Sequence, residues 1–252
     1  MNKLIFFDVD GVLVESSREI MLTSWNEYNQ WLADIDLPHA PFTLCYGDIP
    51  NEFLVSRGEL MKHTHKGYYR VALNMFTLAG LDPYKVDKAL IQAVSEVDPL
   101  LKEATMARLA MVRQRLLAEG DISTLARGYN EVDYRWIEQK MSQGELYFVT
   151  NNAFSINSFA AVAFTPDETF VRRPEGAIHN KAEHINAICA ERCVSHDRVL
   201  FIDDSLASLQ DVDHGSAVPN ENCLQNSWAE KRPSPDYQRL DWQAIVARYE
   251  SL

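Results

Sequence analysis

The segment most indicative of the fold is Leu4-Ile5-Phe6-Phe7-Asp8-Val9-Asp10-Gly11-Val12. The uninterrupted apolar run over residues 4–7 is typical of a strand that is buried on both faces of a sheet. Residues two apart on an extended chain point the same way, so we expect Asp8 and Asp10 to face one pocket. Gly11 then allows the chain to turn sharply away. The stretch predicts a parallel strand that ends in a pair of carboxylates.

Two later segments show the same order of an apolar run followed by polar residues. Residues 146–149 precede Thr150-Asn151, and residues 199–202 precede Asp203-Asp204. The carboxyl ends of parallel strands meet along one edge of an open sheet, where ligands bind. We therefore expect these polar groups to converge with the first two aspartates at that edge.

The rest of the chain contains a helical region and then a region in which helices and strands alternate. Apolar residues recur three or four apart between residues 16 and 127, which predicts helices over 19–32, 66–79, 84–97 and 100–118. Beyond this region we predict helices over 133–142, 155–160, 181–192 and 205–212, and strands over 145–149, 161–164, 198–202 and 216–218. This order predicts an α/β fold, a doubly wound parallel sheet over 1–15 and 128–252 with a helical insert over 16–127. A last amphipathic helix, 242–249, is expected to pack on the sheet.

Composition narrows the class of protein. The 252 residues are 46% hydrophobic and 24% charged, which is ordinary for a soluble globular chain. The net charge of −12 comes without any basic run, which argues against a nucleic-acid partner. No apolar run approaches the roughly 20 residues needed to span a bilayer, and residues 4–7 are too short for a signal peptide. We expect a cytoplasmic protein that does not bind a membrane.

The acidic residues indicate a cation. Carboxylates that face one pocket repel one another unless a cation or a proton lies between them. A set of oxygen ligands from Asp8, Asp203 and Asp204 suits Mg²⁺. Within the first pair, Asp8 and Asp10, the natural division is one ionised nucleophile and one acid/base group.

Three further positions indicate a bound phosphate. The Thr150 hydroxyl and the backbone N–H of Asn151 could hold a phosphoryl oxygen, while Asn152 or Ser155 caps the following helix. Lys181 opens a predicted helix, so its ammonium and the positive helix end could act on the same anion. Arg172-Arg173, which lie a few residues earlier, compete with the lysine for this role.

Together the four motifs resemble those of the haloacid dehalogenase (HAD) superfamily of phosphohydrolases. They read FFDVDGV, YFVTNN, NKAEHI and LFIDDS, in that order. The helical insert directly behind the first motif resembles the C1-cap branch, which includes phosphoglycolate phosphatase and β-phosphoglucomutase. The resemblance covers residues 1–15 and 130–218. It implies a HAD-like core and a helical cap domain over 16–127.

The resemblance also implies roles for the site residues. Asp8 would be the nucleophile that forms an aspartyl-phosphate, and Asp10 the general acid and then the general base. Mg²⁺ would be held by the Asp8 carboxylate, the backbone carbonyl of Asp10 and the pair Asp203-Asp204. Thr150, the Asn151 backbone and Lys181 would bind the phosphoryl oxygens. These roles describe a Mg²⁺-dependent phosphatase that acts on a small phosphorylated metabolite.

Other functions use related motifs. A phosphomutase uses the same aspartate pair and differs in how it excludes water, and a catalytically silent binding module could keep the fold. A dehalogenase of this superfamily lacks the second aspartate, so Asp10 argues against it. Glu15 and Ala182 depart from the usual Asp and Pro of C1-cap relatives, which leaves the substrate open. Specificity is expected from polar residues of the insert, namely Arg57, His63, Lys66, Tyr69 and Arg70.

Overall fold

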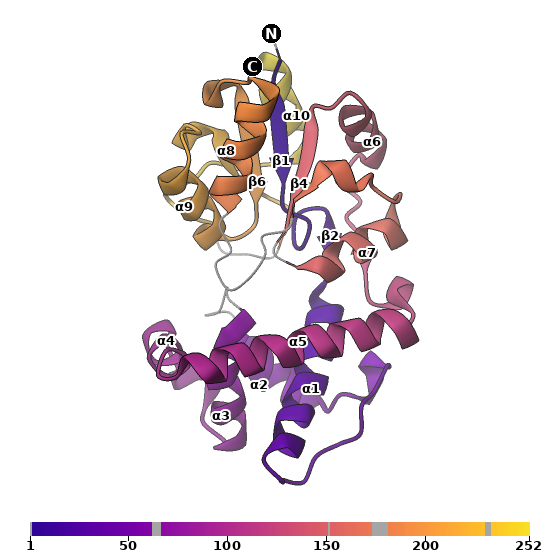
Figure 1. Cartoon of the computed structure of the whole chain (residues 1–252), viewed down its shortest axis with the longest axis vertical. Helices are drawn as coiled ribbons and strands as arrows, with labels where there is room; N and C mark the ends of the chain where they lie inside the picture. Colours follow the sequence, from indigo (N-terminus) through magenta and orange to yellow (C-terminus); the bar gives the residue numbers. More distant parts are fainter. Residues whose placement is uncertain (1, 62–66, 151, 173–180, 230–232) are drawn as a thin grey trace. The chain divides into compact units, whose positions relative to one another are not determined.

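The predicted parallel sheet is present, with strands in the order β5-β4-β1-β6-β7-β8. The computed structural model describes residues 2–61, 67–150, 152–172, 181–229 and 233–252. Within these residues the strands of the sheet are β1 (Leu4–Phe7), β4 (Leu146–Val149), β5 (Val171–Arg172), β6 (Val199–Asp203), β7 (Cys223–Asn226) and β8 (Arg239–Leu240). Figure 1 shows β1 between β4 and β6, and every recorded pairing in this sheet is parallel. The doubly wound α/β fold is confirmed.

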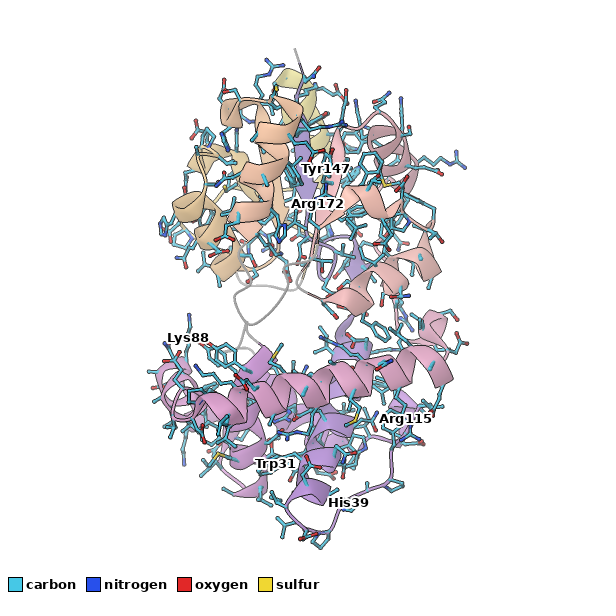
Figure 2. The ribbon with its side chains drawn as sticks, viewed as in Figure 1. Trp31, His39, Lys88, Arg115, Tyr147 and Arg172 are labelled. Atoms are coloured by element: carbon cyan, nitrogen blue, oxygen red, sulfur yellow. The ribbon has the colours of Figure 1, made fainter. Side chains whose placement is uncertain are left out.

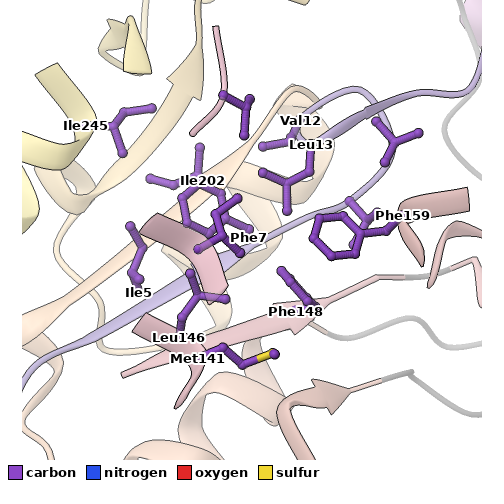
Figure 3. Packing of buried hydrophobic residues seen from close by; sticks show 14 of the residues in the cluster. Ile5, Phe7, Val12, Leu13, Met141, Leu146, Phe148, Phe159, Ile202 and Ile245 are labelled. Atoms are coloured by element: carbon purple, nitrogen blue, oxygen red, sulfur yellow. The ribbon is translucent and has the colours of Figure 1, made fainter. Parts of the chain in front are cut away.

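Alternate side chains of the strands build two apolar layers, one on each face of the sheet. Ile5 and Phe7 pack in the layer formed with α6 (Tyr134–Ser142), α7 (Ala153–Val162) and α10 (Trp242–Ser251), part of which Figure 3 shows. Leu4 and Phe6 pack in the layer formed with α8 (Lys181–Arg192) and α9 (Leu206–Gly215). Both faces of β1 are therefore covered, which explains why its sequence is apolar at every position.

A separate helical unit follows the first strand and its loop. Contacts divide the chain into an α/β unit, Met1–Ser16 with Ala126–Leu252, and a helical unit, Ser17–Leu125. The helices of the second unit are α1 (Ser17–Asp34), α2 (Asn51–Met61), α3 (Arg70–Leu78), α4 (Lys88–Ser95) and α5 (Pro99–Glu119). Among the described helices of the whole chain, none combines the length and apolar composition that crossing a membrane requires.

A short antiparallel ladder lies where the chain leaves and re-enters the α/β unit. It consists of β2 (Val14–Glu15) and β3 (Arg127–Gly128). Val14 lies opposite Gly128, and Glu15 lies opposite Arg127. The two ends of the α/β unit are therefore held side by side.

Buried charges hold the helical unit together. Arg57 donates from Nε to Ser24 Oγ at 2.7 Å and from Nη2 to Asn74 Oδ1. Asn74 in turn donates to both carboxylate oxygens of Glu27, and Arg108 Nε lies 3.2 Å from the same carboxylate. Burial lowers the pKa of Arg57 to about 9, with Glu27 opposing the shift, so the guanidinium stays charged at neutral pH. This network joins α1, α2, α3 and α5.

Some predicted elements differ from the structure. The predicted strand over 161–164 is wrong, because residues 161–162 complete helix α7 and the strand next to β4 is β5. A short apolar run fits a buried helix as well as a strand, and nothing in the run itself decides between them. The predicted strand over 216–218 is also wrong. The strand at this side of the sheet is β7, which was not predicted because its second half, Gln225 and Asn226, is polar. Helix α10 packs on the sheet as predicted.

Candidate active site

Three predicted aspartates lie close together at one edge of the sheet. Asp8 directly follows β1, and Asp203 and Asp204 lie at the end of β6. Because β1 and β6 are parallel neighbours, with Phe7 opposite Ile202, they end at the same edge. One carboxylate oxygen from each aspartate lies within 4.8 Å of the other two. The sheet thus gathers three carboxylates that are far apart in sequence.

Gly11 allows the loop that carries the first two aspartates to lie against Asp204. Its φ of +75° is one that other residues rarely adopt, and a Cβ built there would lie 2.2 Å from Asp204 Oδ2. The turn is closed by Gly11 N–H, which donates to Val14 O at 2.8 Å, and by Val14 N–H, which donates to Val9 O at 3.0 Å. A side chain at position 11 would therefore push the loop that carries the first aspartates away from Asp204.

Lys181 lies within the acidic group. Its Nζ is 3.0 Å from Asp8 Oδ1 and 2.7 Å from Asp203 Oδ2, and its side chain is 2% exposed. Burial alone would lower the pKa of Lys181, but Asp203 and Asp8 outweigh it and raise the pKa. The lysine is therefore a buried ammonium shared by two carboxylates.

The same surroundings act on Asp8. Burial raises the pKa of Asp8 well above its usual range, Lys181 opposes this, and the charges of Asp203, Asp10 and Asp204 add to it. One lysine is thus too little positive charge for the carboxylates around it. A divalent cation held by oxygens of Asp8, Asp203 and Asp204 would supply the rest, and this donor set fits Mg²⁺.

The Asp10 carboxylate has different neighbours. Its Oδ2 accepts hydrogen bonds from Asn152 Nδ2 at 3.0 Å and from the Ser155 hydroxyl. Asn152 is also the N-cap of α7, where its Oδ1 accepts from Phe154 N–H at 3.0 Å. The sequence identified Asn152 and Ser155 only as candidate helix caps, and their contact with Asp10 could not be read from it.

Thr150 follows β4, the other neighbour of β1, and is buried. Its hydroxyl accepts a hydrogen bond from Asn152 N–H at 3.3 Å, which connects it to the residue that contacts Asp10. Asn151, predicted to offer its backbone N–H to a phosphate, lies outside the described residues.

Comparison with known proteins identifies the fold. No protein-family model matches the chain, and no curated protein matches it. Among solved structures, a predicted phosphoglycolate phosphatase from Haemophilus somnus is 18% identical, with a TM-score of 0.55 over 98% of this chain and 97% of its own. A haloacid dehalogenase-like hydrolase from Streptococcus pneumoniae is 13% identical, with a TM-score of 0.54 over 98% of each chain. This chain has the HAD-like fold.

A third similar structure is CbbY from Rhodobacter sphaeroides in complex with phosphate. It is 19% identical, with a TM-score of 0.52 over 95% of this chain and 93% of its own. Each of these HAD-like structures matches the helical unit as well as the sheet, because the matches run over nearly the whole chain. At these identities the likeness establishes the HAD-like fold and leaves the activity to be argued from the site.

The arginines that compete with Lys181 lie elsewhere in this HAD-like fold or outside the described residues. Arg172 Nη1 donates to the carbonyls of Thr169 at 2.7 Å and Val171 at 3.2 Å. Its guanidinium lies 5.7 Å from the ring centre of Tyr147, and Figure 2 shows the two residues side by side. Arg173 lies outside the described residues. Of the described candidates, Lys181 is the one whose ammonium contacts the acidic group.

The polar candidates of the helical unit are largely internal. Arg57, Tyr69 and Arg70 are buried, and Arg57 is bound within the network described above. Burial also lowers the pKa of Arg70, to about 10. His63 and Lys66 lie outside the described residues. Arg57 therefore serves the interior of the helical unit.

Proposed function

We propose that the protein is a Mg²⁺-dependent phosphatase that hydrolyses a small phosphorylated metabolite through an aspartyl-phosphate on Asp8. The observation that carries this proposal is the buried Lys181 ammonium between Asp8 and Asp203, with Asp204 in the same group. A carboxylate nucleophile beside fixed positive charge is suited to phosphoryl transfer, where positioning and charge stabilisation provide most of the catalysis. The CbbY structures with phosphate and with xylulose-(1,5)bisphosphate support a small phosphorylated substrate.

In the first step, an Asp8 oxygen attacks the phosphorus atom, and the bond from phosphorus to the leaving oxygen breaks. Asp10 gives that oxygen its proton, so that the product leaves as an alcohol. In the second step, Asp10 takes a proton from water, whose oxygen attacks the phosphorus and releases inorganic phosphate from Asp8. Lys181 and the Thr150 hydroxyl hold the phosphoryl oxygens during both steps.

The cation would be held by Asp8, the backbone carbonyl of Asp10 and the pair Asp203-Asp204. When bound, it supplies positive charge against the phosphoryl oxygens. We further propose that the helical unit acts as a cap that selects the substrate, because the strand-edge residues handle only the phosphoryl group.

The first test is phosphate release from p-nitrophenyl phosphate by the intact protein. We expect release in Mg²⁺, loss of release in excess EDTA, and recovery when Mg²⁺ is restored. A panel of phosphorylated metabolites assayed in the same way would then identify the substrate class and separate net hydrolysis from phosphate migration within the substrate. If neither the aryl ester nor any metabolite lost phosphate with any divalent cation, the proposed activity would be wrong.

Cation binding should also be visible without turnover. Mg²⁺ at about 100 times its Kd should stabilise the fold by about 2.7 kcal/mol, and the melting temperature should rise by roughly 2–4 °C per kcal/mol. Asp204→Asn should weaken this effect more than Asp203→Asn. Both oxygens of Asp203 already accept hydrogen bonds, from Lys181 at 2.7 Å and from Ser205 N–H at 2.8 Å.

Differential scanning fluorimetry over a Mg²⁺ titration measures this effect. Asp236→Asn is the matched control, because it removes the same charge from an exposed position of the α/β unit. Its titration should match that of the wild type. An unchanged Mg²⁺ response in both Asp203→Asn and Asp204→Asn would remove this pair from the cation site.

A further inference from the structure

We infer that Asn152 and Ser155 are positioning residues that fix the Asp10 carboxylate for proton transfer to the leaving group. This inference rests on the proposed phosphatase activity, in which Asp10 is the acid and then the base. Both side chains donate to the same oxygen, Asp10 Oδ2. Both are also buried: Asn152 is 8% exposed and Ser155 is fully enclosed.

The amide of Asn152 has its orientation set by the helix that it caps. Its Oδ1 is occupied by Phe154 N–H at 3.0 Å, and its own backbone N–H donates to Thr150 Oγ1 at 3.3 Å. The Nδ2 group must then face Asp10, and an amide nitrogen can only donate. The helix cap and the contact with Asp10 are therefore made by the two ends of one rigid amide.

Ser155 supplies the second donor from the first turn of α7. Its backbone N–H bonds to Asn152 O at 3.0 Å, so its position is fixed by the same helical turn. The Ser155 hydroxyl and the Asn152 amide thus both donate to Oδ2 and hold the carboxylate in one orientation.

This arrangement gives the two aspartates of the first motif different tasks. Asp8 contacts a cationic group, Lys181, whereas the described contacts of Asp10 include two neutral donors. Carboxylates placed in different surroundings take different roles in acid–base chemistry. Proton transfer also depends on a donor held within hydrogen-bond reach, so loss of these contacts should slow the step that needs a proton.

The test compares substrates that need a proton with one that does not. The alkoxide of an alkyl phosphate is a poor leaving group and needs the proton of Asp10, whereas p-nitrophenolate leaves without it. Ser155→Ala should lower kcat/KM for an alkyl phosphate by about ten-fold or more, up to the 10²–10⁴-fold that positioned proton transfer contributes in full. For p-nitrophenyl phosphate, kcat/KM covers only the first step, in which this leaving group needs no proton, so it should change little. Asn152→Ser, which keeps a good N-cap and removes the amide donor, should behave in the same way.

Two controls separate positioning from general damage. Ser158→Ala makes the same change in the same helix, at a buried hydroxyl with no hydrogen-bond partner among the described residues, and should leave both substrates unaffected. In an Asp10→Ala background, Ser155→Ala should cost nothing further, because its partner is already absent.

The outcomes are distinct. A wild type that releases no phosphate from any ester would overturn the proposed function and this inference with it. A working wild type whose Ser155→Ala and Asn152→Ser variants keep the alkyl rate, or lose both rates equally, would overturn the inference alone. Additive losses in the Asp10→Ala background would overturn it as well.

Discussion

Asp8→Asn should fold and lose phosphate release by at least about 10³-fold, because a carboxamide cannot form the covalent intermediate. The fold should tolerate the change well. Burial and neighbouring carboxylates raise the pKa of Asp8 in the folded state, so ionisation of Asp8 costs more there than in the unfolded chain. A neutral side chain of the same shape removes that cost. Steady-state kinetics and thermal unfolding at neutral pH measure the two effects together.

The covalent step can be tested directly in the same pair of proteins. Acid-quenched wild type should carry a phosphoryl group on the peptide that contains Asp8, and mass spectrometry should find none in Asp8→Asn. Asp236→Asn, an equal charge change at an exposed site, should retain full activity. More than a few per cent residual turnover in a clean preparation of Asp8→Asn would contradict the covalent mechanism.

Lys181→Met should destabilise the fold by about 3–5 kcal/mol at neutral pH, the cost of removing one partner from a buried ion pair. The loss leaves Asp8 and Asp203 without the ammonium that contacts both. Activity should fall as well, because the same ammonium is proposed to hold the phosphoryl group. Urea denaturation at neutral pH measures the change in the free energy of unfolding.

The destabilisation of Lys181→Met should shrink in acid. The pKa of Asp8 is already raised in the folded protein, and removal of Lys181, which opposes the rise, should raise it further. The folded state then binds more protons than the unfolded state at pH values above the ordinary carboxyl pKa of about 3.9. The free energy of unfolding therefore falls as pH rises through this window and recovers as pH is lowered.

A second lysine, whose acidic partners are more exposed, provides the comparison. Lys140 also contacts two carboxylates, Glu145 at 3.0 Å and Glu250 at 3.2 Å, but these are 32% and 49% exposed. Lys140→Met should cost no more than about 1 kcal/mol. Equal losses in the two variants, or no pH dependence in Lys181→Met, would show that burial does not set the strength of the Lys181 contacts.

The parts of the fold that could be predicted are those where packing requires apolar residues at several regularly spaced positions. Residues 4–7 are apolar throughout because both faces of β1 are covered, and α8 was predicted with its bounds at Lys181 and Arg192. Strands β5 and β8 are two residues long, so they contain no periodicity to detect. Helix α2 was not predicted, since its apolar positions are few and spaced irregularly.

The candidate site also has a part that could be predicted and a part that could not. Asp8, Asp203 and Asp204 could be placed together because each follows an apolar run that predicts a parallel strand. The contact between Asp10 and Asn152 joins residues 142 positions apart and depends on the orientation of one amide. Sequence spacing determines which loops meet at a sheet edge, but it does not determine which side chains within those loops hydrogen-bond.

The ladder between β2 and β3 has a consequence for modular construction of such proteins. Glu15 and Arg127 already lie opposite each other as the last pair of this antiparallel ladder. The points where the chain leaves and re-enters the α/β unit are therefore close enough for one tight turn to join them. A two-residue Asn-Gly turn is the ordinary closure for antiparallel strands paired in this way. The helical unit is therefore attached at a point where a tight turn could replace it, and units of quite different length could be exchanged there without changing the register of the sheet.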